Sequence, residues 1–248
     1  MAKSVLKIIA CFVIGTVGGI FADQILWPYF IVRPLFYQYE LEQAPVYITE
    51  KKENTIYIQE NLALRELVEE VTPAVIGVKT KTIDGEILKG AGVVLTSDGL
   101  IVTLASLVPW GSEFYFFVDD KWPAYQILKR DLENDLALIK VEKNGLKTRG
   151  FADLEKLKLA EPVFLVGMVF PLATSTEQIL TPPQNKVNTG IITLFSENTI
   201  QTNILEDQEI SGSPLFNFDG RVVGLSTIDE TGKVSAIPIS IIRAFAGF

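Results

Sequence analysis

The chain has 248 residues, of which 48% are hydrophobic and 21% charged, and this is enough apolar material for one sizeable globular domain or two small ones. Its formal net charge of -8 argues against nucleic acid as a partner, because phosphate binding needs a concentrated Lys/Arg face. With one cysteine, Cys11, and no histidine, the chain cannot form an internal disulfide or a Cys/His zinc site, and it cannot run Ser-His-Asp or Cys-His catalysis.

The amino-terminal segment has the properties of a membrane anchor. Residues 5–22 are apolar except for one lysine and one threonine, and apolar character resumes at residue 25. A bilayer span needs about 20 mostly apolar residues. Lys3 and Lys7 precede the stretch, and Trp27 and Tyr29 follow it, as suits the two interfaces. We therefore predict a single-pass transmembrane anchor within residues 1–33, in the cytoplasmic (inner) membrane, with the carboxyl-terminal domain extracytoplasmic.

A cleaved signal peptide is the alternative for this segment, because it shares the basic start and the apolar core. Small residues occur at Gly18, Gly19 and Ala22, but no clear A-x-A cleavage site is present. An uncleaved anchor is the preferred interpretation.

Residues 34–66 are expected to form a juxtamembrane linker and a short helix. Pro28 and Pro34 end the first helical stretch, because proline lacks the N–H that a helix needs. Residues 56–71 then carry apolar side chains at helical spacing between charged ones, which predicts an amphipathic helix ending before Pro73.

From residue 74 onward, short β-branched runs alternate with turn signals such as Asp84-Gly85 and Asn144-Gly145. The spacing favours an antiparallel sandwich or barrel rather than a βαβ fold. The run Gly90-Ala91-Gly92 is bracketed by β-branched residues and predicts a strand rather than a phosphate loop. No EF-hand spacing is present, so no cofactor and no metal site is expected. The expected strands are 74–82, 90–96, 100–104, 114–118, 136–141, 163–166, 187–194, 199–202, 214–217, 222–226 and 234–238, with a closing helix at 240–246.

Specific residues now add a family resemblance. The run Ser211-Gly212-Ser213-Pro214-Leu215, followed by Asp219-Gly220 and a Val-Val-Gly strand, resembles the nucleophile loop of trypsin-like serine proteases of the HtrA (Deg) family. This register places Ser211 at the nucleophile position. Residues 131–141 resemble the segment that supplies the triad aspartate, which would be Asp135. Residues 93–108 resemble the strand pair before the catalytic histidine, and Ser106 stands where that histidine should be.

The resemblance covers about residues 67–246 and implies an all-β fold. This is the chymotrypsin/trypsin-like double six-stranded β-barrel, here preceded by an N-terminal transmembrane helix. The protease-like domain would be residues 67–248, with barrels at about 67–150 and 151–248 and a cleft between them. The PDZ domain that many relatives append is not expected. The resemblance also implies a peptide-binding strand edge at Gly224, Leu225, Ser226 and Thr227.

Two departures from the family pattern bear on chemistry. A serine nucleophile needs an imidazole to take its proton, and the hydroxyl of Ser106 is no such acceptor; losing this histidine costs on the order of 10⁶ in rate in another serine protease. Where the family has glycine and asparagine before the nucleophile, this chain has Glu209 and Ile210. The oxyanion-hole equivalents are thus Glu209 and Ser211. A carboxylate near a developing oxyanion opposes it by about 1 to 4 kcal/mol at 4 Å.

The leading hypothesis is therefore a membrane-anchored, catalytically inactive HtrA-like pseudoprotease that binds proteins or peptides outside the cytoplasm. One alternative is a serine endopeptidase in which Ser211 works with a non-histidine base; Lys140 is the lysine within the matched triad segments. Another is a structural oligomeric membrane subunit, a trimer as in many HtrA relatives, assembled through residues 37–67. Each of these residues also has a purely structural interpretation. Ser211 could be an ordinary turn residue, and Asp135 could be a surface or capping aspartate. Residues 206–209 could form a solvated acidic loop.

Overall fold

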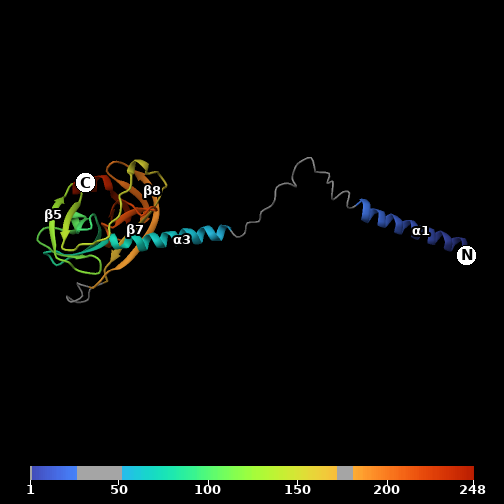
Figure 1. Cartoon of the computed structure of the whole chain (residues 1–248), viewed down its shortest axis with the longest axis horizontal. Coiled ribbons are helices and arrows are strands. Elements are labelled where there is room, and N and C mark those ends of the chain that lie inside the picture. The colour runs from blue at the N-terminus through green and yellow to red at the C-terminus, as the bar shows by residue number, and fades with distance from the viewer. Residues whose placement is uncertain (1, 27–51, 172–180) are drawn as a thin grey trace. The chain divides into compact units, whose positions relative to one another are not determined.

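The computed structural model describes residues 2–26, 52–171 and 181–248, and the chain divides into two compact units, Met1–Thr55 and Ile56–Phe248. In the first unit, helix α1 (Ala2–Phe21) continues into a π-helical turn, η1 (Ala22–Leu26) (Figure 1). Its span Ile9–Leu26 is exposed, apolar and long enough to cross a membrane. A membrane anchor and a signal sequence both fit this segment. Pro28 and Pro34, and the predicted linker up to residue 51, lie outside the described residues.

Helix α3 (Lys52–Val71) crosses the boundary between the two units. It starts four residues before the predicted helix and is followed by a 3-10 turn, η3 (Thr72–Ala74), that contains Pro73. Leu64, Leu67 and Val68 pack against the core of the second unit. The carboxylate and carbonyl of Glu70 accept hydrogen bonds from the Arg149 guanidinium, which holds the end of the helix against the domain. The trimer expectation for residues 37–67 stays a prediction.

The first half of the second unit is a six-stranded antiparallel sheet in the order β4-β1-β2-β3-β6-β5. Its edge strands meet through aromatic rings: Tyr125 of β5 lies 6.1 Å from Phe114 and 4.9 Å from Phe116 of β4, centroid to centroid. The sheet therefore curls back on itself. Its strands are β1 (Val75–Lys81), β2 (Ile87–Val94), β3 (Leu100–Thr103), β4 (Glu113–Phe117), β5 (Tyr125–Asp131) and β6 (Leu136–Val141).

The second half is a closed barrel in the order β10-β11-β12-β9-β8-β7, in which β7 and β8 run side by side (Figure 1). Helix α4 (Ile239–Ala246) follows and buries Ile239, Ile242 and Phe245 in the same core cluster as the first sheet. The predicted fold class is confirmed. The strands are β7 (Pro162–Val169), β8 (Gln184–Phe195), β9 (Ile200–Leu205), β10 (Pro214–Asn217), β11 (Val222–Ile228) and β12 (Lys233–Pro238).

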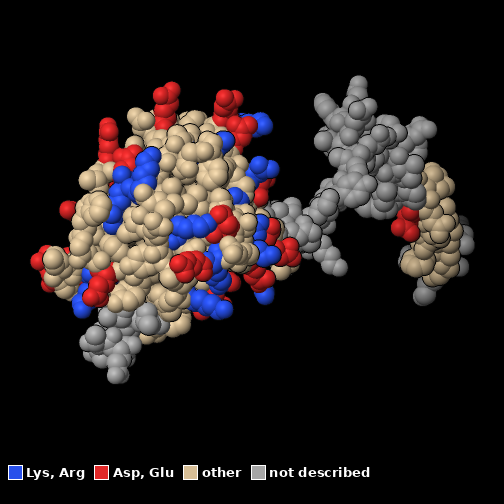
Figure 2. Space-filling model, turned by 60° about the vertical axis from the view of Figure 1, so that its left-hand side comes forward, with Lys and Arg blue, Asp and Glu red and all other residues tan. Residues whose placement is uncertain are grey.

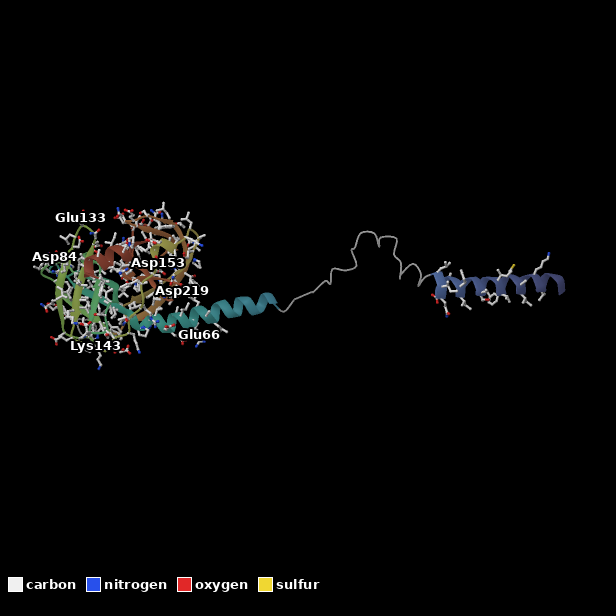
Figure 3. All side chains as sticks on the ribbon, turned by 45° about the horizontal axis from the view of Figure 1, so that its top comes forward. Glu66, Asp84, Glu133, Lys143, Asp153 and Asp219 are labelled. Atoms are coloured by element: carbon white, nitrogen blue, oxygen red, sulfur yellow. The ribbon has the colours of Figure 1, made fainter. Side chains whose placement is uncertain are left out.

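Figure 2 shows basic and acidic side chains next to one another over the visible face of the second unit. The labelled side chains of Glu66 and Asp219 are exposed (Figure 3). The short 3-10 turns η4 (Ala105–Leu107), η5 (Leu154–Lys156) and η7 (Gln208–Ile210) connect the strands, and two of them carry the candidate site.

Gly92 provides a test of how tightly the first sheet is packed. A Cβ at this residue of β2 would lie 2.5 Å from the carbonyl oxygen of Val102 on β3. We expect Gly92→Ala to lower the free energy of unfolding by about 1 to 3 kcal/mol, the usual cost of overpacking. Urea unfolding of the full chain in detergent, followed by tryptophan fluorescence, measures this loss. Gly150→Ala is the control, because its nearest neighbour, the Cγ of Arg221, lies at 3.9 Å. Equal losses in both variants would contradict the packing argument.

Candidate active-site cleft

A cleft of about 420 Å³ opens between the first sheet and the second barrel. The three triad-equivalent residues Ser106, Asp135 and Ser211 all line it, although they come from distant parts of the sequence. Ser106 lies in η4, Asp135 in the turn before β6, and Ser211 directly after η7. The structure therefore brings the three predicted positions to one place.

Asp135 is held by Ser106 through both carboxylate oxygens. The Ser106 N–H donates to Oδ1 at 2.7 Å, and the Ser106 hydroxyl donates to Oδ2 at 2.9 Å. The Asp135 carbonyl accepts from Ala105 N–H at 3.1 Å, and the residue has a φ of 52°, a left-handed conformation that aspartate tolerates better than most residues. The aspartate thus braces η4, and the serine hydroxyl contacts it where the family resemblance predicts an imidazole.

The backbone before Ser211 is folded into the 3-10 turn η7. Ser211 N–H donates to the carbonyl of Gln208 at 2.9 Å, and Glu209 does not adopt a positive φ. An oxyanion hole needs N–H groups aimed at the place where negative charge develops. Because the turn uses the Ser211 N–H internally, this N–H is not offered to a ligand in the cleft.

The loop at Ser211 is fastened on both sides by backbone hydrogen bonds. Its carbonyl accepts from Ala91 N–H of β2 at 2.8 Å, and Gly212 N–H donates to Ser226 of β11 at 2.8 Å. The approach is close: Gly212 has a φ of 80°, and a Cβ there would lie 2.4 Å from the Ala91 carbonyl oxygen. A Cβ at Gly90 would lie 2.7 Å from the Ser211 carbonyl oxygen. The predicted strand Gly90-Ala91-Gly92 is confirmed, and Gly90 makes room for the loop.

An ion pair spans the cleft between Lys89 of β2 and Glu209 of η7. The Lys89 Nζ lies 2.9 Å from the Glu209 Oε1. The Lys89 side chain is only 9% exposed, whereas that of Glu209 is 51% exposed. Lys89 pairs in register with Lys79 of β1; burial, together with the charge of Lys89, lowers the pKa of Lys79. Sequence reasoning missed Lys89, and a lysine at the end of a predicted strand gives little signal of such a role.

The proposed peptide edge is less open than expected. Strand β11 pairs with β12 over Gly224, Leu225, Ser226 and Thr227. On its other side Gly224 and Leu225 pair with β10, and Ser226 bonds to Gly212 and Ser213. Gly224 to Ser226 are therefore not a free edge. Thr227 and Ile228, which line the cleft, pair with β12 but extend past β10 on the other side of β11.

Comparison with known proteins places this geometry in a family. Residues 90–225, more than half of the chain, match the family model of the trypsin-like peptidase domain. The chain belongs to this family. Over 160 residues the trypsin-like domain is 30% identical to a probable periplasmic serine endoprotease DegP-like from Halomonas elongata, covering 61% of this chain and 33% of that protein. Over 204 residues it is 30% identical to serine protease HTRA1 of Xenopus laevis, covering 73% of this chain and 42% of that protein.

These matches confirm the resemblance to the HtrA family. The chain spans less than half the length of the curated relatives it matches. The activity of those whole proteins is therefore not carried over to the trypsin-like domain by similarity alone.

Lys140, the lysine considered as an alternative base, does not line the cleft of the trypsin-like domain. Its Nζ contacts Asp98, at 2.5 Å from the carboxylate and 2.6 Å from the carbonyl. The hydrogen bond from Lys140, with one from Thr96, lowers the pKa of Asp98 to about 2. Lys140 therefore contacts Asp98 at the surface and does not contact Ser211.

The acidic run before Ser211 is partly structural. The Glu206 side chain is only 4% exposed, and its carboxylate lies 2.6 Å from the Lys186 Nζ. It also accepts from the Asn188 amide at 2.9 Å. The hydrogen bond to Glu206 is the main cause that raises the pKa of Lys186. The expectation of a wholly solvated loop is thus wrong for Glu206.

The Lys89–Glu209 pair predicts an asymmetric response to mutation. Glu209→Gln leaves a buried ammonium without its carboxylate, whereas Lys89→Met leaves an exposed carboxylate that water can solvate. Removing one partner of a buried polar pair costs about 1 to 3 kcal/mol, so we expect Glu209→Gln to be the more destabilising change. Urea unfolding of both single variants and the double variant measures this, and the coupling follows from the double-mutant cycle. A larger loss in Lys89→Met would contradict the burial argument.

Proposed function

We propose that this chain is a membrane-tethered, catalytically inactive HtrA-like protein whose cleft binds an extended segment of another protein outside the cytoplasm. The observation that carries the proposal is the Ser106–Asp135 contact. Both carboxylate oxygens accept hydrogen bonds from a serine at the position where the family mechanism requires histidine. A hydroxyl cannot take the proton of Ser211 near neutral pH, so the nucleophile has no base in the usual place.

The nucleophile loop supports the same conclusion independently. The N–H of Ser211 is bonded within η7, and Glu209, with its carboxylate paired to Lys89, lines the same cleft. Losing an oxyanion-hole donor costs about 10² to 10³ in rate in another serine protease. General-base catalysis and oxyanion stabilisation are thus impaired by different residues.

The walls of the cleft suit an extended peptide. On one wall, β3 pairs with β2 only over Gly92, Val93 and Val94. No strand in the described part of the chain pairs with Ile87 and Leu88 on that side, and both residues line the cleft. On the opposite wall lie Thr227 and Ile228. A bound segment between these walls would gain main-chain hydrogen bonds by strand addition, and the side-chain pockets would set its specificity.

The apolar helix supports the tethered location. Its span Ile9–Leu26 is long enough for a bilayer, and the two lysines before it favour a cytoplasmic amino terminus. The curated relatives from Halomonas elongata and Pseudomonas putida are named as periplasmic endoproteases. We infer an extracytoplasmic trypsin-like domain held at the cytoplasmic membrane.

Restoring the family residues tests the proposal. We expect wild-type protein to resist labelling by a fluorophosphonate at Ser211, and Ser106→His alone to remain almost unlabelled, because the Ser211 N–H is still bonded to Gln208. Ser106→His combined with Glu209→Gly and Ile210→Asn supplies the base and frees the loop, so labelling should rise by at least about 10²-fold. Ser211→Ala in the triple variant is the control. Labelling of the wild type that disappears in Ser211→Ala would overturn the proposal.

A serine peptidase that uses Lys89 is the second candidate, since Lys89 lines the same cleft as Ser211. An acceptor for the Ser211 proton needs a free lone pair, whereas the Lys89 Nζ lies 2.9 Å from the Glu209 carboxylate. Fluorophosphonate labelling of the wild type that is lost in Lys89→Met, with folding intact by circular dichroism, would replace the inactive protein by this peptidase.

A further inference from the structure

A groove of about 430 Å³ lies on the first sheet at the seam where β4 meets β5. Its walls are mainly aromatic and aliphatic, and its charged lining residues among those described are both basic. No described carboxylate lines this groove. The candidate active-site cleft, in contrast, is lined by Glu86, Asp135 and Glu209. The residues used below are Trp110, Phe114, Tyr125, Leu128, Lys129 and Arg130.

Arg130 is the central cation of the groove. Its guanidinium carbon lies 4.1 Å from the centroid of the Trp110 ring and 5.8 Å from that of Phe114, and its Nε–H donates to the Val108 carbonyl at 2.8 Å. The side chain is half-buried, and burial lowers the pKa of the guanidinium. The described residues supply no carboxylate within ion-pair distance of Arg130, unlike Arg149 or Lys186. The stacked guanidinium is therefore positioned without a counter-ion from the described chain.

Lys129 provides a second cation of the same kind. Its Nζ lies 4.6 Å from the centroid of the Phe245 ring and donates to the Phe245 carbonyl at 3.3 Å. The nearby carboxylate of Asp131 accepts hydrogen bonds from the backbone of Glu133 and Asn134 and from the Asn134 amide. It forms no ion pair with Lys129 in the described part of the structure. Arg130 thus supplies the guanidinium of the groove, and Lys129, which also lines it, carries its ammonium at Phe245 nearby, in a protein whose net charge is -8.

The rim of the groove is unusually apolar for a surface. Trp110 is 76% exposed and Leu128 48% exposed. Ile83, which is 81% exposed, lies next to the groove, because its Cδ1 would be 4.0 Å from a Cβ on Gly111. Exposed tryptophan, tyrosine and aliphatic side chains beside arginine and lysine are the combination that sits at the interface of a lipid bilayer.

We propose that this groove binds the phosphate of an anionic phospholipid headgroup and docks the trypsin-like domain on the membrane surface. The planar fork of Arg130 matches a phosphate in two-pronged geometry, and Lys129 adds attraction for an anionic leaflet. The exposed rim favours a lipid over a free phosphate, because Trp110, Leu128 and Ile83 would enter the interface. The inference uses the proposed tether to bring the domain to the bilayer, but it does not depend on the state of the catalytic cleft.

The test measures tryptophan contact with lipid in the full chain. A Trp27→Phe background, reconstituted in phosphatidylcholine nanodiscs with or without phosphatidylglycerol, leaves Trp110 and the half-buried Trp122 as reporters. Acyl chains brominated near the headgroup should quench tryptophan emission when phosphatidylglycerol is present. This quenching should disappear in Trp110→Phe and in Arg130→Gln, and it should be reduced in Lys129→Gln.

Three comparisons keep the result interpretable. Lys147→Gln removes the same charge from an exposed lysine outside the groove and should leave quenching intact. Arg130→Lys keeps the charge without the fork and should quench less than wild type, even if Arg130→Gln folds poorly. Quenching that is equal without phosphatidylglycerol, or unchanged in both Arg130 variants, overturns the proposal.

A soluble probe separates the two sources of phosphate. If glycerol phosphate shifts Trp110 emission while phosphatidylglycerol discs cause no quenching, the groove binds a free phosphate and the lipid proposal is wrong. Alkaline carbonate extraction tests the tether separately. If extraction releases the protein from membranes, the proposed anchor is wrong. The same quenching, measured with added phosphatidylglycerol vesicles, then still tests whether the groove binds an anionic lipid.

Discussion

The backbone contact between β2 and the loop at Ser211 is the constraint on which the site depends. Ala91 donates to the Ser211 carbonyl, and Gly212 donates to Ser226, so one loop is tied to the first sheet and to the second barrel. The approach leaves no room for side chains at Gly90 or Gly212. With the loop held in this way, Ser211, Ser106 and Asp135 share one cleft. The contact is a packing requirement of the fold and persists whatever the chemistry of the cleft.

Three polar groups of the cleft are paired with other residues of the chain. Asp135 accepts from Ser106, Glu209 pairs with Lys89, and the Ser211 N–H bonds to Gln208. Catalysis requires groups that stay preorganised and unsatisfied until the transition state forms. These pairs support the proposal that the cleft binds an extended segment, in which exposed strand edges and side-chain pockets would provide the contacts.

Sequence patterns predicted most strands but not all of them. Buried strands such as β6, with Leu136 to Ile139 all inaccessible, show continuous apolar runs. Strand β5 was missed because it is an edge strand, exposed at most positions, and carries no alternation. The open edge expected at Gly224 to Ser226 was likewise absent, because both sides of β11 pair with elements distant in the sequence. Whether a strand has a partner on one side or on both depends on segments that are distant in the sequence, and local patterns do not contain this information.

The sequence by itself determined that the protein has no histidine, so imidazole chemistry is excluded. The order of the matched motifs predicted that Ser106 stands at the position of the family's catalytic histidine and Asp135 at that of its aspartate partner. An apolar stretch of sufficient length also identified the candidate membrane span. Only the tertiary structure decided that Lys89 rather than Lys140 lines the cleft, that the Ser211 N–H is already bonded, and that Arg130 stacks on Trp110. The reason is physical: Lys89 and Glu209 are 120 residues apart in the chain, and burial and pairing of such groups arise from packing between segments.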